Sequence, residues 1–207
     1  MEETRNLELI KRIKALADTG LVYAEDEYNR ERYEEIREIG LELLGSVSEK
    51  PLKTFKNFFM PVTDYPTAKV DVRGFVLNDA NEILMAKESV DGKWTIPGGW
   101  ADVGYSPSEV VVKEIEEETG LRSAVVRLLA VYDKKCHKHP PEPYYIYKLI
   151  FLCTKIGGAL QPGFDMRGAS FFSIDNLPEL SEDRILESQL RQLFKKVIEN
   201  DREVYFD

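Results

Sequence analysis

The spacing of apolar residues divides the chain into two parts. In residues 5 to 47 apolar side chains recur at steps of three and four, first at Leu7, Ile10, Ile13 and Ala17, and then at Ile36, Ile39, Leu43 and Leu44. That is the period of an amphipathic helix, and Gly20 between the two runs predicts a break. We therefore expect a helical hairpin within residues 1–50. Residues 51–68, which hold three prolines, are interpreted as a linker.

From Lys69 onward the apolar period becomes two, which is typical of β-strands. The pattern predicts strands over the ranges 70–77, 82–87, 125–133, 144–154 and 169–174. One helix is expected between Pro107 and Thr119, and another from about Arg184 to Val197. Because strands and helices alternate irregularly, residues 69–207 are predicted to form an α/β domain with a mixed sheet between helices.

Composition and charge narrow the function classes. The 207 residues carry a net charge of -9, which disfavours a nonspecific nucleic-acid binder, since such a protein usually presents a basic face. No stretch approaches the length of apolar sequence that crosses a bilayer, and the N-terminus lacks a signal-peptide pattern. Cys136 and Cys153 are the only cysteines, too few for a disulfide framework. We therefore expect a cytoplasmic protein without a membrane partner.

The helix expected at residues 107–119 has strong local signals at both ends. Ser106 is a good N-cap, Pro107 suits the first helical position, and Glu109 stands where a capping box needs it. Gly120 suits the left-handed residue that ends a helix. These signals predict a helix of about three turns.

Three carboxylates share one face of that helix. Glu114, Glu117 and Glu118 are i, i+3 and i+4 neighbours, and their repulsion costs a few tenths of a kcal/mol per pair. A hard divalent cation would offset this cost, because Mg²⁺ and Mn²⁺ prefer carboxylate oxygens. The alternative interpretation is a solvated acidic face with no ligand. The two glycines before the helix, Gly98 and Gly99, favour a site, since glycine lets a backbone approach a ligand closely.

With its flanking glycines, this stretch resembles the signature box of the Nudix hydrolases. The positions that match the box in register are Gly99, Glu114, Ile115, Glu117, Glu118, Gly120 and Leu121. Two positions depart from it: Tyr105 replaces the first box glutamate, and Lys113 replaces the arginine. The match spans 23 positions at fixed spacing, so the resemblance implies an α/β/α sandwich around a mixed sheet.

The resemblance also implies a divalent cation, Mg²⁺ or Mn²⁺. It assigns the metal to Glu114, Glu118 and the carbonyl of Gly99, with Glu117 as a further ligand or as the base that activates water. Lys113 takes the place of an arginine that orients a glutamate, and it keeps the charge without the planar fork. Many members add one glutamate from a loop near the last core strand. The corresponding segment here, residues 163–169, contains no glutamate, and Asp165 is its only carboxylate.

The N-terminal helices resemble the extension of one Nudix subgroup, whose members act on CDP-choline or ADP-ribose. The implied activity is hydrolysis of the diphosphate bond of a nucleoside diphosphate linked to another group, which releases a nucleoside monophosphate. An acidic protein rich in aromatic residues favours choline slightly, through cation–π attraction. Candidate substrate-binding residues are Arg73, Lys87, Trp100 and Tyr105. For Arg73, an ion pair with Asp71 or with a box carboxylate is an equal alternative.

Two further expectations concern assembly and the loss of activity. The hairpin is too small to bury its own apolar stripe, so we expect it to dock on its own catalytic domain or, as a homodimer, on a second copy. Because Tyr105 and Lys113 depart from the box, the alternative function is a Nudix module that binds a nucleotide and regulates a partner without catalysis.

Overall fold

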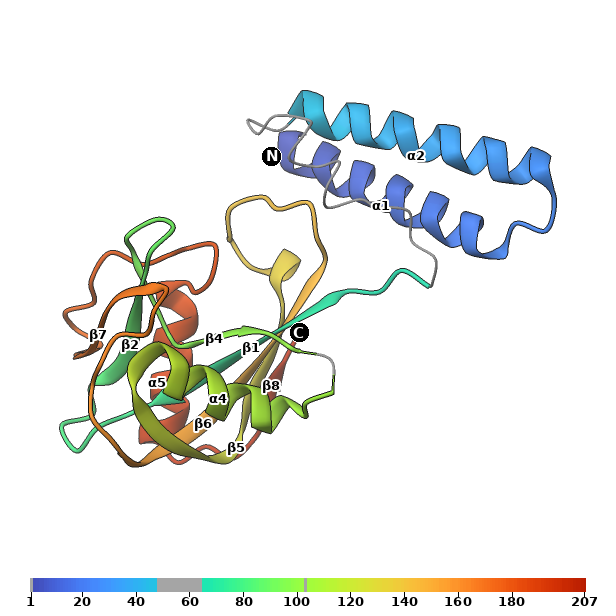
Figure 1. Ribbon diagram of the computed structural model, residues 1–207. Coiled ribbons are helices and arrows are strands. Elements are labelled where there is room, and N and C mark those ends of the chain that lie inside the picture. Colours follow the sequence, from blue (N-terminus) through green and yellow to red (C-terminus); the bar gives the residue numbers. More distant parts are fainter. Residues whose placement is uncertain (1, 48–64, 103) are drawn as a thin grey trace. The chain divides into compact units, whose positions relative to one another are not determined.

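The computed structural model describes residues 2–47, 65–102 and 104–207, which belong to two compact units. The first unit spans residues 1–68 together with 141–144, and the second spans residues 69–140 and 145–207. Of the predicted linker at residues 51–68, only residues 65–68 lie within the described part of the chain. Figure 1 shows both units coloured along the sequence.

The first unit contains the predicted pair of helices, α1 (Glu2–Tyr23) and α2 (Glu27–Val47), joined by a short turn. Leu7, Ile10 and Leu44 are buried together within it. The expected break at Gly20 is wrong: α1 continues through this glycine to Tyr23. Packing between the helices explains the glycine, because the ring of Tyr33 on α2 fills the space beside it. A Cβ added to Gly20 would lie 2.4 Å from this ring.

The hairpin carries a stripe of apolar side chains that are solvent-exposed in the single chain. Its α1 members follow steps of four, three and seven, and its α2 members follow steps of three and four. They are Leu9, Ile13, Leu16, Tyr23, Ile36, Ile39 and Leu43. These exposed side chains form the surface that we call the hairpin stripe. Such a stripe is typical of an interaction surface.

The second unit contains two sheets. The larger has the strand order β4 (Gly98–Trp100), β1 (Lys69–Val76), β6 (Ile146–Gly158), β5 (Leu121–Asp133) and β8 (Tyr205–Phe206). It is mixed, because β1 runs parallel to β6 and β5 parallel to β8, whereas the β1–β4 and β5–β6 pairs are antiparallel. The smaller antiparallel sheet has the order β3 (Trp94–Thr95), β2 (Ile83–Glu88) and β7 (Met166–Phe172).

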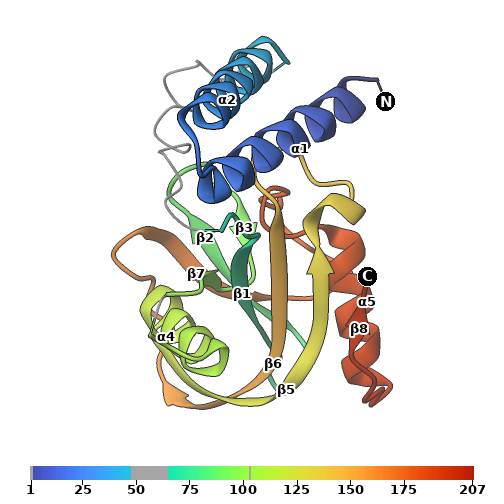
Figure 2. The same ribbon diagram turned by 90° about the vertical axis from the view of Figure 1, so that its right-hand side faces the viewer.

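Helices cover the sheets from both sides, as the resemblance implied. The helix α4 (Pro107–Thr119) and the helix α5 (Glu187–Ile198) lie on opposite sides of the strands in Figure 2. A short 3₁₀ helix, η1 (Lys134–Cys136), follows β5. Val72 and Val76 of β1 pack toward α4, whereas Phe75 packs into the core beneath α5. The predicted α/β/α class is therefore confirmed.

Several predicted boundaries are corrected. Strand β1 alternates in sequence but is buried on both faces from Asp71 onward, because α4 covers one face and the second sheet and α5 cover the other. Strand β6 begins at Ile146 rather than at residue 144, and it ends at Gly158 rather than at residue 154. The last helix starts at Glu187 rather than Arg184. Strand β8 was not predicted.

Candidate active site

The acidic helix α4 has the capped ends that its sequence predicts. The Ser106 side chain accepts a hydrogen bond from the Glu109 amide, while the Glu109 carboxylate accepts one from the Ser106 amide. Pro107 opens the helix, and Gly120 ends it in the left-handed conformation, with φ at 72°. These local bonds fix the start and the end of α4. They thereby fix which glutamates face the glycines of β4.

Glu118 is the most buried of the three helix carboxylates, with 6 % of its surface exposed. The amide of Gly98 donates a hydrogen bond of 3.0 Å to its Oε2. Burial raises the pKa of Glu118 to about 8, and the charges of Glu114 and Glu88 act in the same direction, against Arg73 and the Gly98 amide. A buried carboxylate in this setting is an electrostatic cost that a cation would relieve.

Glu114 lies against the neighbouring glycine of the same strand. A Cβ added to Gly99 would lie 2.9 Å from Oε1 of Glu114, so the carboxylate occupies the space that a side chain would need. Burial also raises the pKa of this carboxyl, and Glu117 adds to the effect while Lys113 opposes it. The Gly98–Gly99 backbone of β4 and the carboxylates of Glu114 and Glu118 therefore meet at one place.

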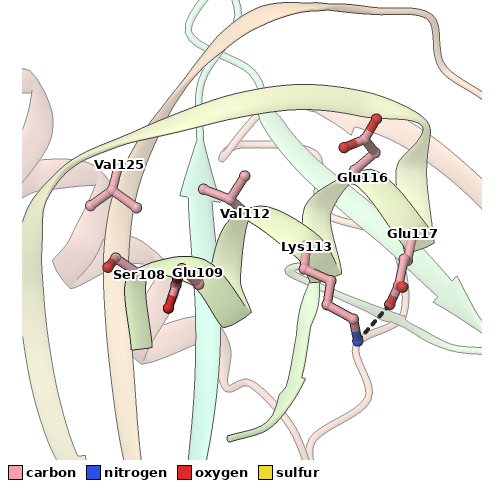
Figure 3. A pocket seen from close by; sticks show the side chains of 7 residues that line it. All are labelled: Ser108, Glu109, Val112, Lys113, Glu116, Glu117 and Val125. Atoms are coloured by element: carbon pink, nitrogen blue, oxygen red, sulfur yellow. Dashed lines mark ion pairs between the residues drawn. The ribbon is translucent and has the colours of Figure 1, made fainter. Parts of the chain in front are cut away.

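Glu117 has a different environment from the other two glutamates. Its carboxylate is exposed and pairs with Lys113, whose Nζ lies 3.1 Å from Oε2 of Glu117 and 3.5 Å from Oδ2 of Asp102. Figure 3 shows this pair at the edge of an open depression of about 660 Å³ between α4 and β5. Lys113 therefore pairs with one of the three glutamates that share this face of α4.

Arg73 lies in a buried charge cluster beneath this site. Its Nε donates to Asp71 at 3.0 Å, and its Nη1 donates to the carbonyl of Ile96. Lys148 of β6 also donates to Asp71. Burial opposes ionisation of Asp71, but the two cations outweigh it and hold the pKa at about 2. Arg73 thus forms the ion pair with Asp71 that was one of the alternatives considered from the sequence. Only 6 % of the surface of Arg73 is exposed, so it supports the site from the protein interior.

The other predicted substrate residues lie at separate places. Trp100 is half exposed at the end of β4, with the ammonium of Lys69 5.2 Å from its ring centroid. Tyr105 is also half exposed, just before α4. Lys87 lies on β2 with its ammonium 5.8 Å from the ring of Trp94. Trp100 directly follows Gly99, whose backbone meets Glu114.

The segment after β5 contains Cys136, His137 and His139. His137 pairs with Asp207 at 2.9 Å, and His139 Nδ1 lies 2.6 Å from the carbonyl oxygen of Glu182. Burial lowers the pKa of His139 to about 4, so this imidazole is neutral. The two histidines therefore support the loop through separate protein contacts.

The residues at the Gly98–Gly99 end of α4 fit a hard divalent cation. The donor set consists of carboxylate oxygens and a backbone carbonyl, which are the ligands that Mg²⁺ and Mn²⁺ prefer. Within residues 2–47, 65–102 and 104–207, however, no three His, Cys, Asp or Glu side chains already stand together as a ligand group. Protein groups occupy the carboxylates instead: the Gly98 amide binds Glu118, and Lys113 binds Glu117.

Comparison with known families identifies both parts of the chain. Residues 67–194 match the model of the Nudix domain, and residues 4–59 match a model described as a UDP-X-like, N-terminal oligomerisation domain. The chain therefore belongs to the Nudix hydrolases, a family of pyrophosphohydrolases. These enzymes generally use divalent metal ions. In the part of the chain that the structure describes, no helix is long and apolar enough to cross a membrane.

Particular relatives resemble the whole chain. A Bacillus subtilis protein named "Putative ADP-ribose pyrophosphatase YjhB" is 42% identical over 99% of this chain and 98% of its own length. An ADP-ribose pyrophosphatase of Methanocaldococcus jannaschii is 33% identical over 70% of this chain and 82% of its length. The crystal structure of a UDP-X diphosphatase superposes with a TM-score of 0.64 at 35% identity, covering 100% of both chains.

Proposed function

We propose that this protein hydrolyses the diphosphate bond of a nucleoside diphosphate linked to a sugar or a similar group, in a reaction that depends on Mg²⁺ or Mn²⁺. The products are a nucleoside monophosphate and the phosphorylated remainder. The observation that carries this proposal is the meeting of Glu114 and Glu118 with the Gly98–Gly99 backbone. Hard oxygen donors converge there beside a backbone without side chains, as a diphosphate and its cation require.

Individual residues take defined roles in this proposal. Glu114, Glu118 and the Gly99 carbonyl would hold the cation, which when bound neutralises diphosphate charge and lowers the pKa of a bound water. Glu117 is exposed, so its carboxylate can reach a water molecule and accept its proton. Lys113 keeps Glu117 in place, and Arg73, fixed by Asp71, supports Glu118 electrostatically.

The substrate that similarity favours is ADP-ribose or a related nucleoside diphosphate sugar. Two of the relatives above are named for ADP-ribose, and the matching crystal structure is named for UDP-X. CDP-choline, which the aromatic and acidic composition favours slightly, stays a prediction. Trp100, which follows Gly99, and Tyr105, which precedes α4, are exposed aromatic residues, and either ring can stack on a base or attract a quaternary ammonium.

The test is a substrate panel with the purified protein, measured with Mg²⁺, with Mn²⁺ and with a chelator. ADP-ribose, UDP-glucose, CDP-choline, CDP-glucose and nucleoside triphosphates are compared by product analysis. The proposal expects a nucleoside monophosphate from at least one diphosphate-linked compound, only with metal present. If choline is recognised, kcat/KM for CDP-choline exceeds that for CDP-glucose at least about tenfold, or roughly 1.4 kcal/mol. Activity on triphosphates alone would exclude the proposed substrate class.

The second candidate function is a nucleotide-binding module without catalysis. Tyr105 and Lys113, which replace two box residues, favour this alternative. All three helix carboxylates are nevertheless present, and Lys113 still pairs with Glu117. A protein that binds ADP-ribose tightly but leaves the whole panel intact with either metal would support the module.

We also propose that the chain assembles as a homodimer through its hairpin, residues 1–50. The family model that matches this region is described as an oligomerisation domain. The hairpin stripe supports this assembly because it exposes seven large apolar side chains in one chain.

A further inference from the structure

Lys69 and Trp100 form a pair of side chains on one face of the larger sheet. The ammonium of Lys69 lies over the indole ring of Trp100, 5.2 Å from its centroid. Both residues reach the surface, since 49 % of Trp100 is exposed and Lys69 is exposed as well. An ammonium at this distance from an indole ring makes a cation–π contact. The exposed ring of Trp100 therefore already has a positive charge over it.

The strand register explains why these two side chains meet. Trp100 of β4 pairs with Asp71 of β1, and the side chains of paired residues point to the same face of a sheet. Lys69 precedes Asp71 by two positions, so it shares that face and is the diagonal neighbour of Trp100. The amide of Lys69 donates a hydrogen bond of 2.9 Å to the carbonyl of Tyr145, which fixes its backbone. The strands themselves thus set the position of the pair.

The pair lies one residue from the proposed cation site. Trp100 follows Gly99, and consecutive Cα atoms are about 3.8 Å apart. Position 99 faces Glu114 of α4, so alternation directs Trp100 to the opposite face of the sheet. Because β4 is the edge strand of the larger sheet, a substrate held at Gly99 can extend around this edge to Trp100.

The carboxylate nearest to Lys69 along β1 is already shared by two other cations. Asp71 accepts hydrogen bonds from both Arg73 and Lys148. It is therefore engaged elsewhere and does not present a separate negative charge for a substrate cation. Such a cation at the ring of Trp100 would instead meet the ammonium of Lys69, and like charges repel.

We propose that Lys69 and Trp100 form the subsite for the group beyond the diphosphate, and that they select an uncharged, hydroxyl-bearing group such as a sugar over a quaternary ammonium. This inference rests on the proposed function and narrows its substrate class. The indole packs against the apolar face of the sugar, and the ammonium of Lys69 donates hydrogen bonds to its hydroxyls. A quaternary ammonium has no acceptor for these bonds, and it needs the ring face over which Lys69 lies.

The experiment compares substrates that differ only in the group beyond the diphosphate. These are the glucose and choline derivatives of CDP, ADP and UDP, and the nucleoside that the parent cleaves fastest is used for the variants. The full-length parent, Lys69→Gln, Lys69→Arg, Trp100→Leu and Lys135→Gln are assayed for kcat and KM at saturating Mg²⁺. Thermal unfolding of each variant establishes that it is folded.

Lys135→Gln is the matched control. It removes the same charge from another contact between an ammonium and a ring, because Nζ of Lys135 lies 5.8 Å from the ring centroid of Tyr145. Lys135 belongs to η1, outside the strands β1 and β4 that carry the proposed subsite. Lys69→Arg is the conservative variant, since it keeps a cation beside Trp100.

The parent should show a kcat/KM for the glucose compound at least about fivefold above that for the choline compound. Lys69→Gln should lower this preference at least about fivefold, whereas Lys69→Arg and Lys135→Gln should keep it within about twofold. Trp100→Leu should raise KM for the glucose compound at least about fivefold with kcat within about threefold, and it tests the subsite even if Lys69→Gln does not fold.

The inference is overturned if the parent prefers the choline compound, if a folded Lys69→Gln keeps the parent preference, or if Lys135→Gln changes that preference as much. A folded Trp100→Leu with the parent KM overturns it as well. If cleavage depends on metal but the preference does not respond to Lys69, only the subsite is wrong. If the parent cleaves none of these compounds with either metal, the proposed function fails and the inference fails with it.

Discussion

Replacing Gly99 with alanine perturbs the site at one defined contact. Gly99 is not among the residues with positive φ, so alanine can adopt its backbone conformation. The new Cβ would lie 2.9 Å from Oε1, 3.0 Å from Cδ and 3.1 Å from Oε2 of Glu114. The clash is with the end of a flexible side chain rather than with backbone. We therefore expect Glu114 to move while the fold is kept.

The size of the effect follows from these distances. Ordinary van der Waals contact begins at 3.4 Å, so the Glu114 carboxylate must retreat by about half an ångström. A misplacement of about 1 Å can cost about 100-fold in rate, so we expect kcat to fall about 10- to 100-fold. This corresponds to about 1.4–2.7 kcal/mol in the barrier. Stability should change by less than about 1 kcal/mol, since alanine restricts the unfolded chain.

The assay measures kcat at saturating metal together with thermal unfolding. Gly40→Ala is the control: its Cβ would meet Ile13 at an ordinary 3.6 Å, within α2 and away from the carboxylates. Gly40→Ala should keep the parent kcat and gain stability, as alanine does in a helix. If Gly99→Ala keeps kcat within threefold of the parent, Glu114 is not positioned against Gly99 for catalysis, and the reasoning is refuted.

Three further predictions concern charge and assembly. Glu118→Gln should lower kcat at least about 100-fold, yet leave the metal-free melting temperature unchanged or higher, because the side-chain amide oxygen still accepts from Gly98 and position 118 no longer places a carboxylate in a buried setting. A kcat within threefold of the parent at saturating Mg²⁺ would show that Glu118 is not part of the metal site. Asp71→Asn should lower the free energy of unfolding by about 3–5 kcal/mol in urea denaturation, because Arg73 and Lys148 lose their shared carboxylate. A decrease of less than about 1 kcal/mol would contradict the proposed contribution of this ion cluster to stability. Light scattering at micromolar concentration should give twice the 23.8 kDa chain mass for the parent. Leu16→Glu, in the hairpin stripe, should give a monomer, whereas the control Val126→Glu, at an exposed position outside the hairpin, should give a dimer. A monomeric parent would count against the hairpin interface.

Local signals allowed the helix α4 to be predicted in full from the sequence. Its N-cap, capping box, first-turn proline and final glycine all lie within residues 106–120 and act on their own backbone. The same holds for the hairpin helices, whose apolar period is carried by consecutive residues. The break expected at Gly20 was wrong because Tyr33, which fills the space beside it, lies on the other helix.

The different burial and partners of the three glutamates of α4 could not be predicted from local sequence signals. Helical spacing places Glu114, Glu117 and Glu118 on one face, but their separate environments depend on β4 and Lys113. Glu88, at the end of β2, pairs with Arg184, almost a hundred positions away along the chain. Sequence spacing gives no sign of such contacts, because they arise only when strands and helices pack.

The most direct test of the proposed function is product formation from ADP-ribose as a function of Mg²⁺, measured side by side for the parent, Glu116→Gln and Glu118→Gln. The account predicts AMP and ribose 5-phosphate from the parent and from Glu116→Gln, rising with Mg²⁺ and abolished by a chelator, and at least about 100-fold less product from Glu118→Gln. Equal turnover by all three proteins, or turnover that persists in the chelator, would contradict the assignment of the carboxylates beside Gly98 and Gly99 to a metal-dependent diphosphate hydrolase.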